Sequence, residues 1–221
     1  MHQYAIIVAG GSGTRMQSEL PKQFLELAGK PILMRTVEAF YFDDIDIILV
    51  LPTNELPLWN SLRLQHNFNV PHRVIEGGAT RFNSVKNGLS AIEHLSGLVA
   101  IHDGVRPLIK RSTITNSFKV ARDLGNAITA VASKDSLRRI TKSGNQAVDR
   151  SEFRLIQTPQ TFRIELIKKA FETEQDTSFT DDASVMEHSG QKINLIEGDY
   201  SNIKITTPED LLIAESLLAQ K

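Results

Sequence analysis

The chain has 221 residues, and its 25 basic and 26 acidic side chains leave a formal net charge of −1. A balance this close to neutral gives no global field that favours nucleic acid or an anionic membrane, so we expect neither as a partner. The absence of cysteine excludes disulfides, thiolate metal sites and a cysteine nucleophile, and it is compatible with a reducing compartment.

The length is ample for one large core, and no linker-like stretch divides the chain, so we expect a single domain over residues 1–221. The first residues lack a basic flank, and the apolar run after them is too short for a signal peptide or a membrane span. We therefore expect a soluble protein of the cytoplasm.

Apolar, β-branched runs alternate with helical patterns along the chain. The runs predict strands at 5–9, 46–51, 72–76, 98–102, 126–132 and 192–197, with a further strand-like run at 202–206. The helical patterns predict helices at 32–42, 55–66, around 85–92, from Ser112 to before Gly125, at 163–174, at 182–188 and from Thr207 onward. This alternation predicts an α/β fold with a mostly parallel sheet and helices on both faces.

The alternation breaks at 135–158. Two polar, extended runs at 136–141 and 146–150 flank a turn that contains Gly144, a pattern typical of a β-hairpin. Such a hairpin carries too little apolar surface for the core, and an isolated hairpin is only marginally stable. We therefore expect a projecting β-hairpin arm at about residues 135–152 that holds a homodimer together.

A glycine-rich loop follows the first predicted strand. Residues 9–16 read A-G-G-S-G-T-R-M, and Arg15 and Lys22 place two positive charges nearby, with Pro21 directly before the lysine. Glycines let backbone N–H groups approach a bulky anion, so we interpret the loop as a polyphosphate site; the alternative is an ordinary surface loop. It is not a P-loop, and Met16 stands where a dinucleotide fingerprint has its third glycine.

Two further candidate sites follow predicted strands, where the sheets of α/β proteins bind their ligands. Asp103 ends the strand at 98–102 and is a candidate Mg²⁺ ligand, unless it only caps a turn. Gly77 and Gly78 end another strand, and the backbone there and Ser84 are candidates to contact a nucleotide; the alternative is a plain glycine turn before a helix.

The remaining polar features have simpler interpretations. The stretch 180–182 reads first as a helix N-cap, and Lys204 as an ordinary edge-strand lysine unless it faces a ligand. We interpret His102 as structural, and the other histidines lack the spacing of a zinc site. No nucleophile constellation stands out, so the expected chemistry is electrostatic and positional, as in nucleotidyl transfer.

Together these stretches resemble the 2-C-methyl-D-erythritol 4-phosphate cytidylyltransferase family. The matching motifs, in order, are A-G-G-S-G-T-R-M, P-K-Q, G-G-x-x-R-x-x-S-V, H-D-G-V-R-P, D-R followed by Q-T-P-Q-x-F, T-D-D-A, and N-I-K-I-T-T-P-E-D-L. The first motif alone would also fit sugar-nucleotide pyrophosphorylases, whereas all seven in this order cover nearly the whole chain. The resemblance implies a Rossmann-like nucleotidyltransferase fold.

The resemblance also implies a reaction and its residues. CMP passes from CTP to 2-C-methyl-D-erythritol 4-phosphate, giving 4-diphosphocytidyl-2-C-methyl-D-erythritol and pyrophosphate. The implied catalytic cations are Arg15, Lys22 and Lys204, and the implied Mg²⁺ ligand is Asp103. The implied nucleotide contacts are Ala9, Gly10, Gly11, Ser12, Gly13, Gly77, Gly78, Ser84 and Asp103. The implied contacts to the methylerythritol phosphate are Arg106, Ser136, Arg150, Thr158, Thr180 and Lys204. Members of the family are homodimers whose arms bring the equivalents of Ser136 and Arg150 to the neighbouring site.

Two other functions stay open at this point. One is an alditol-5-phosphate cytidylyltransferase acting on ribitol 5-phosphate, although the runs at 157–160 and 180–184 look closer to the methylerythritol enzyme. The other is an inactive nucleotide-binding protein, which would predict loss of Lys22, Asp103 or Lys204. All three residues are present.

Overall fold

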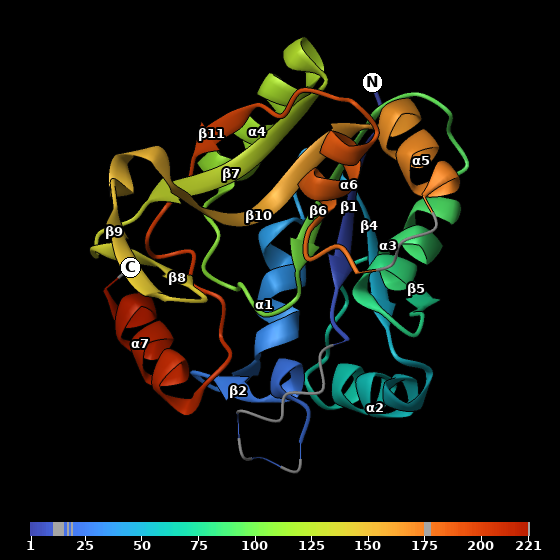
Figure 1. Cartoon of the computed structure of the whole chain (residues 1–221). Coiled ribbons are helices and arrows are strands. Elements are labelled where there is room, and N and C mark those ends of the chain that lie inside the picture. The colour runs from blue at the N-terminus through green and yellow to red at the C-terminus, as the bar shows by residue number, and fades with distance from the viewer. Residues whose placement is uncertain (11–15, 17, 19, 175–177, 221) are drawn as a thin grey trace.

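The protein is described here by a computed structural model covering residues 1–10, 16, 18, 20–174 and 178–220 (Figure 1). In this part of the chain the central sheet has seven strands in the order β11-β7-β10-β6-β1-β4-β5. Its strands are β1 (Gln3–Val8), β4 (Asp46–Leu51), β5 (Arg73–Glu76), β6 (Leu98–Asp103), β7 (Asn126–Ala132), β10 (Arg154–Arg163) and β11 (Leu195–Glu197).

The sheet is mostly parallel, as the alternation of strands and helices predicts. β1 pairs in parallel with β4 and β6, β4 with β5, and β7 with β11. β10 runs antiparallel between β6 and β7, with a register shift between Ile156 and Gln160. The sequence did not predict β10, because Pro159 and the polar residues beside it argue against a central strand.

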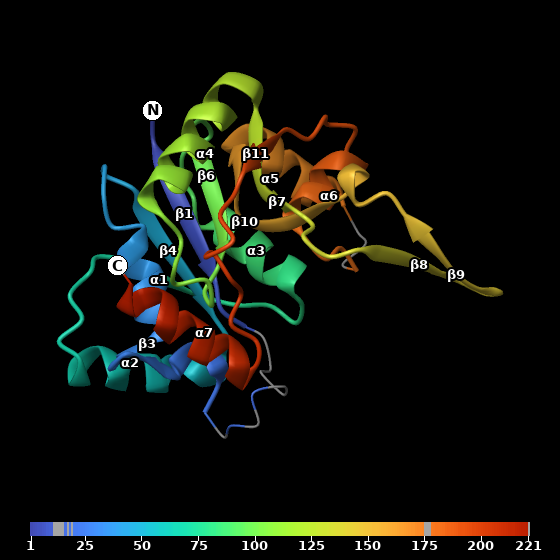
Figure 2. The ribbon, with the colours of Figure 1, turned by 90° about the vertical axis from the view of Figure 1, so that its left-hand side faces the viewer.

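Helices cover both faces of the sheet, and the alternation of side chains along β1 assigns them to a face (Figures 1 and 2). Ala5 and Ile7 pack in one cluster with α1 (Ile32–Ala39), α2 (Leu56–Gln65) and α4 (Arg111–Leu124). Tyr4 and Ile6 pack in a second cluster, whose helices are α3 (Arg81–Ser90), α5 (Ile164–Thr173) and α6 (Asp182–His188). The predicted α/β class, with helices on both faces, is therefore confirmed.

Local sequence signals set the start of one helix, whereas packing sets the start of another. Thr207 caps α7 (Pro208–Ala219) in a full capping box with Asp210, as its sequence predicts. The predicted start of α4 at Ser112 is wrong: Lys110 is the N-cap, and its carbonyl accepts hydrogen bonds from the backbone of Thr113 and Ile114. Packing of the helix against the sheet outweighs the cap preference of a serine. None of the described helices has the length and apolar character needed to cross a membrane.

Short elements complete the framework. A two-stranded pair joins β2 (Glu26–Leu27) to β3 (Lys30–Pro31), and single 3₁₀ turns occupy Lys22–Phe24, Thr53–Glu55 and Arg150–Glu152. Helix α7 packs on a third, smaller cluster that includes Leu27 and Ile205. The prediction of a strand at 202–206 is wrong: this segment belongs to no strand of the described sheets.

The predicted hairpin is confirmed as a separate two-stranded sheet. β8 (Leu137–Thr141) and β9 (Gly144–Val148) are antiparallel and project away from the body of the molecule (Figure 2). Nearly all of their side chains are exposed, including Ile140, at 79%. Such an arm gains little stability from the core of its own chain.

Candidate active site

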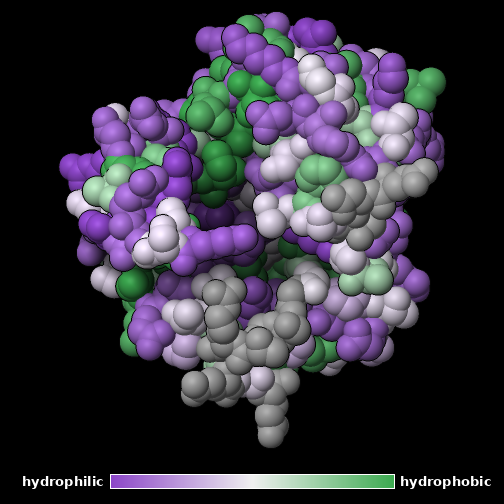
Figure 3. Space-filling view, viewed as in Figure 1, coloured by the Kyte–Doolittle hydropathy of each residue, from purple (hydrophilic) through white to green (hydrophobic). Residues whose placement is uncertain are grey.

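Two adjoining cavities lie at the carboxyl ends of the parallel strands, and Figure 3 shows the hollow in this face of the molecule. The first has a volume of about 310 Å³ and the second about 370 Å³. The first cavity is lined by the end of β1, by Lys22 and Gln23, and by the segment from Gly78 to Arg81. The second is lined by Arg106, by the irregular part of β10 and by the start of α6.

Three residues line both cavities: Arg81, Asp103 and Lys204. Two cations and one carboxylate therefore form the shared wall. This arrangement suits two anionic ligands that must be brought into contact, because the cations of the shared wall offset the repulsion between the two anions.

The structure gathers most of the predicted site residues around these cavities. Those lining the first cavity are Ala9, Gly10, Lys22, Gly78, Ser84, Asp103 and Lys204. Those lining the second are Asp103, Arg106, Thr158, Thr180 and Lys204. The predicted residues Gly11, Ser12, Gly13 and Arg15 lie outside the described residues.

Three predicted residues lie elsewhere in this chain. Gly77 sits behind the wall of the first cavity, where its N–H donates to the carbonyl of Leu51 at 2.7 Å. Ser136 and Arg150 lie at the base of the hairpin arm and are exposed, and the Arg150 guanidinium donates to the backbone carbonyl of Lys134. Neither residue lines one of the two cavities of this chain.

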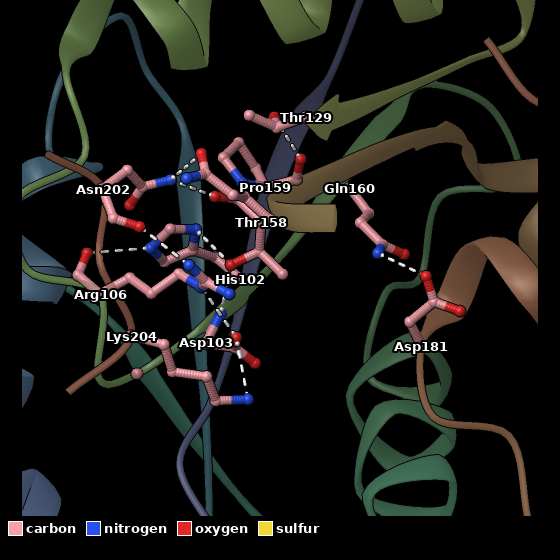
Figure 4. Close-up of polar contacts among 12 residues, drawn as sticks. His102, Asp103, Arg106, Thr129, Thr158, Pro159, Gln160, Asp181, Asn202 and Lys204 are labelled. Atoms are coloured by element: carbon pink, nitrogen blue, oxygen red, sulfur yellow. Dashed lines mark hydrogen bonds and ion pairs between the residues drawn. The ribbon is translucent and has the colours of Figure 1, made fainter. Parts of the chain in front are cut away.

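Asp103 is the electrostatic centre of the shared wall (Figure 4). Its Oδ2 accepts a hydrogen bond from Arg106 Nε at 3.0 Å and lies 3.2 Å from Lys204 Nζ. Burial alone would raise the pKa of Asp103, but the charges of Lys204, Arg106 and Arg81 outweigh burial and hold this pKa well below its usual range. The carboxylate is thus ionised at neutral pH, and its contacts with two cations go beyond the role of a turn cap.

His102 is structural, as predicted, and it orients the backbone of Asp103. The His102 Nε2 lies 3.2 Å from the carbonyl of Arg106, which can only accept, so this nitrogen carries the proton. Nδ1 then accepts from the Thr158 hydroxyl at 3.1 Å, while the Thr158 oxygen accepts from Asp103 N–H at 3.0 Å. This chain of bonds links β6 to β10 beneath the second cavity (Figure 4).

We expect the free energy of unfolding to fall as the pH is lowered from about 6.5 to about 4, because burial lowers the pKa of His102 to about 4. In the unfolded chain His102 takes up its proton near the ordinary value of 6.5, so the unfolded state binds more protons in this window. The neutral imidazole makes its full contribution to the free energy of unfolding above pH 6.5, and this contribution is lost toward pH 4. It amounts to roughly 3 kcal/mol.

Urea unfolding of the wild type and of His102→Gln, at about pH 7.5 and at about pH 4.5, checks this expectation. Glutamine offers an N–H donor group and a carbonyl acceptor but does not titrate. The stability advantage of the wild type should therefore shrink in acid. A difference between the two proteins that stays constant with pH would contradict the expectation.

Asn202 is a site residue that the sequence did not reveal. It is fully buried; its side-chain Nδ2 donates to the backbone carbonyl of Thr158 at 2.8 Å, and its backbone carbonyl accepts from Arg106 Nη1 at 2.8 Å. Ile205 N–H then bonds the carbonyl of Val105 at 3.0 Å. These anchors hold the segment between them so that Lys204 faces Asp103, and the interpretation of Lys204 as an edge-strand lysine is wrong. The only sequence signal for Asn202 was its place directly before the alternating run Ile203-Lys204-Ile205.

The glycine turn before α3 is rigidly built. Thr80 caps the helix by accepting from Asn83 N–H, and Ser84 Oγ accepts from Gly78 N–H at 3.1 Å while donating to the carbonyl of Thr80 at 3.0 Å. A Cβ at Gly78 would lie 2.3 Å from Asn83 Cβ, so only glycine fits. The turn is therefore a fixed wall of the first cavity.

Comparison with known proteins is consistent with this arrangement. Residues 3–220 match the family model described as 2-C-methyl-D-erythritol 4-phosphate cytidylyltransferase. A protein of that name from Azobacteroides pseudotrichonymphae is 53% identical over 220 residues, which cover 98% of both chains. Another, from Bacteroides fragilis, is 48% identical and covers 99% of this chain and 100% of its own.

Solved structures of proteins with related names are similar to this chain over nearly its whole length. The crystal structure of 4-diphosphocytidyl-2C-methyl-D-erythritol synthase from Anaerococcus prevotii aligns with a TM-score of 0.84 at 31% identity, over 99% of this chain and 96% of the other. That of 2-C-methyl-D-erythritol 4-phosphate cytidylyltransferase from Thermus thermophilus aligns with a TM-score of 0.82 at 30% identity, over 99% and 100%. The chain therefore belongs to the 2-C-methyl-D-erythritol 4-phosphate cytidylyltransferase family, as its seven motifs predict.

Proposed function

We propose that the first cavity binds CTP, that the second binds 2-C-methyl-D-erythritol 4-phosphate, and that CMP is transferred between them across the wall they share. The observation that carries this assignment is that Arg81, Asp103 and Lys204 line both cavities. The products are 4-diphosphocytidyl-2-C-methyl-D-erythritol and pyrophosphate. Family membership favours this acceptor over ribitol 5-phosphate.

The reaction needs no general base from the protein. The second pKa of a phosphate monoester is about 6, so the attacking oxygen is already ionised at neutral pH. This oxygen forms a bond to the α-phosphorus of CTP, and the bond from the α-phosphorus to the β-phosphate oxygen breaks, releasing pyrophosphate. The protein must hold the two anions together and stabilise the charge of the transition state, which is the role we assign to Lys22 and Lys204 together with Arg15.

Asp103 is the residue that would hold Mg²⁺. It is ionised, it faces the junction of the cavities, and Mg²⁺ takes one or two carboxylates together with phosphate oxygens and water. Among the described residues there is no group of three or more histidines and carboxylates that could hold a metal by itself. When bound, Mg²⁺ neutralises charge on the phosphates.

We assign the hairpin arm to a homodimer interface. Ser136 and Arg150 are exposed at its base, and the arm projects from the chain, which supports delivery of these residues to the second cavity of a partner (Figure 2).

The absence of cysteine supports the cytoplasm as the compartment.

Subunit complementation tests the arm. Arg150→Ala and Lys204→Ala should each be nearly inactive, but mixed dimers contain one site with both residues if Arg150 acts in the neighbouring site. Refolding the two variants together should then restore roughly a quarter of wild-type turnover. No gain above the separate variants would exclude exchange of the arm.

Pyrophosphate release from CTP in the presence of MgCl₂, with methylerythritol 4-phosphate and ribitol 5-phosphate run in parallel, tests the activity. Turnover with the first acceptor alone is expected. Turnover with ribitol 5-phosphate alone would overturn the assignment of the acceptor, and silence with both in a protein that still binds CTP would support an inactive nucleotide-binding protein.

A further inference from the structure

The Arg81 guanidinium lies in the shared wall, and it is held there by one carboxylate. Arg81 is the first residue of α3, and its Nη1 and Nη2 donate to Asp182 Oδ1 and Oδ2 at 2.8 and 2.6 Å. The pair is bidentate, a geometry that fixes the plane of the guanidinium as well as its position. Its two residues are 101 positions apart in the sequence.

Asp182 acts from behind the wall. Its side chain is only 1% exposed, whereas that of Arg81 is 26% exposed, and Asp182 is not among the residues that line either cavity. Burial alone would lower the pKa of Arg81, but the Asp182 carboxylate outweighs burial and raises it. The carboxylate is engaged on both oxygens by the guanidinium and lines neither cavity, so it can act on a ligand only through Arg81.

Asp182 is in turn fixed to the sheet. It is the first residue of α6, and the Gln160 side chain on β10 accepts from the N–H groups of Asp182 and Ala183 at 3.1 and 2.8 Å. The same amide donates to Asp181 Oδ2 at 3.0 Å (Figure 4). Gln160 is 1% exposed and lies two residues after Thr158, which bonds the backbone of Asp103.

A continuous set of contacts therefore runs from β10 through the N-terminus of α6 to the N-terminus of α3. The α3 end carries Thr80 and Ser84 in the wall of the first cavity, and the α6 end carries Asp181 and Ser184 in the wall of the second. The Arg81–Asp182 pair is the direct ionic contact between these two ends.

We propose that Asp182 is a positioning residue for the transfer reaction, which holds the Arg81 guanidinium against both ligands and keeps the two cavities in register. This inference rests on the function proposed for the two cavities. The guanidinium has five N–H groups, and Asp182 engages two of them, which leaves donors for an anion at the shared wall. Without the carboxylate, the cation rotates away from this geometry and the α6 wall separates from the α3 wall.

Steady-state kinetics of Asp182→Asn, Asp182→Glu and Arg81→Lys test the proposal. Asp182→Asn removes the charge and one acceptor, and kcat/KM for both CTP and the acceptor should fall by about tenfold to a hundredfold. Arg81→Lys keeps the charge but loses the bidentate geometry and should show a similar loss. Asp182→Glu keeps a carboxylate at this position and should retain most of the wild-type kcat/KM.

Asp43→Asn is the matched control. It removes the same type of carboxylate from a pair with Arg111, 2.8 Å long and exposed, and asparagine tolerates the left-handed backbone of this position, where φ is 52°. Its kinetic constants should equal those of the wild type. If the Asp182 and Arg81 variants only lower the melting temperature and keep wild-type kcat/KM well below it, the pair is merely structural and the proposal is wrong.

A double-mutant cycle shows whether Asp182 acts through Arg81. In an Arg81→Ala background, Asp182→Asn should cause no further loss of kcat/KM; a further loss of the full single-variant size would contradict the coupling. If Asp182→Asn does not fold, the change of kcat/KM in Arg81→Lys tests the proposal. Wild-type turnover and calorimetric titration with CTP distinguish a failure of the proposed function from a failure of this inference. A wild type that shows neither turnover nor CTP binding would overturn the proposed function, whereas an active wild type whose folded Asp182 and Arg81 variants keep its kcat/KM would overturn the positioning role.

Discussion

Replacement of Lys204 by alanine should lower kcat by about a hundredfold or more. Lys204 lines both cavities, and its ammonium lies 3.2 Å from Asp103 Oδ2, which places its charge between the two proposed ligand sites. Loss of one preorganised charge-stabilising group typically costs roughly 2.7–4 kcal/mol in the barrier, provided that it acts in the transition state more than in the ground state. Stopped-flow or steady-state measurement of pyrophosphate release at saturating CTP and acceptor gives the value.

The fold should tolerate this change. The Lys204 side chain is 42% exposed, and the segment around it is held by Asn202 and Ile205 rather than by the lysine. The melting temperature should therefore shift little, and Lys204→Arg should recover part of kcat because it keeps a cation. Near-normal turnover of a folded Lys204→Ala protein would remove Lys204 from the catalytic residues.

Asp103→Asn should have the largest effect, with kcat lowered on the order of a thousandfold. The substitution keeps the shape of the side chain but removes the charge that Lys204, Arg106 and Arg81 surround. Two consequences add: the oxygen ligand proposed for Mg²⁺ becomes a neutral amide, and the cations of the shared wall lose the carboxylate that orients them. Turnover measured over a series of MgCl₂ concentrations separates the two.

A weakened metal site predicts that high MgCl₂ restores part of the Asp103→Asn turnover, whereas misplaced cations predict no recovery. Circular dichroism and thermal unfolding should accompany the assay, because Arg106 still bonds the carbonyl of Asn202 and this contact helps the fold to survive. A folded Asp103→Asn protein with more than a tenth of wild-type turnover would exclude an essential role for the carboxylate.

Much of the sheet could be predicted because its parallel strands are buried on both faces. β1, β4 and β6 are almost continuous apolar runs, a pattern that a half-exposed strand does not show. β10 could not be predicted, because its central residues Gln157, Thr158 and Gln160 are polar yet buried. Their partners come from β6, α6 and the segment at 202–206, and no local pattern reveals that such partners exist.

The candidate site divides in the same way. The places of Gly10, Gly78 and Asp103 after strands predicted that they would lie together, because the carboxyl ends of parallel strands meet at one edge of a sheet. Lys22 and Lys204 were expected beside them only from the resemblance to the family. The same motifs did not reveal what each residue touches. Thr158, expected at the substrate, also supports the backbone of Asp103, and Arg81 and Asp182 stood in two separate motifs without an assigned role.

The sequence by itself determined the α/β class, the position of the hairpin arm, the family, and which residues are candidates for the chemistry. These properties follow from periodicity, glycine placement and ordered motifs, all of which are local along the chain. Only the tertiary structure decided the antiparallel β10, the bonding of Lys204 and Arg106 to Asp103, and the pairing of Arg81 with Asp182. Each of these depends on contacts between segments far apart in the sequence, and the energy of such a contact depends on burial and partner geometry that local patterns do not contain.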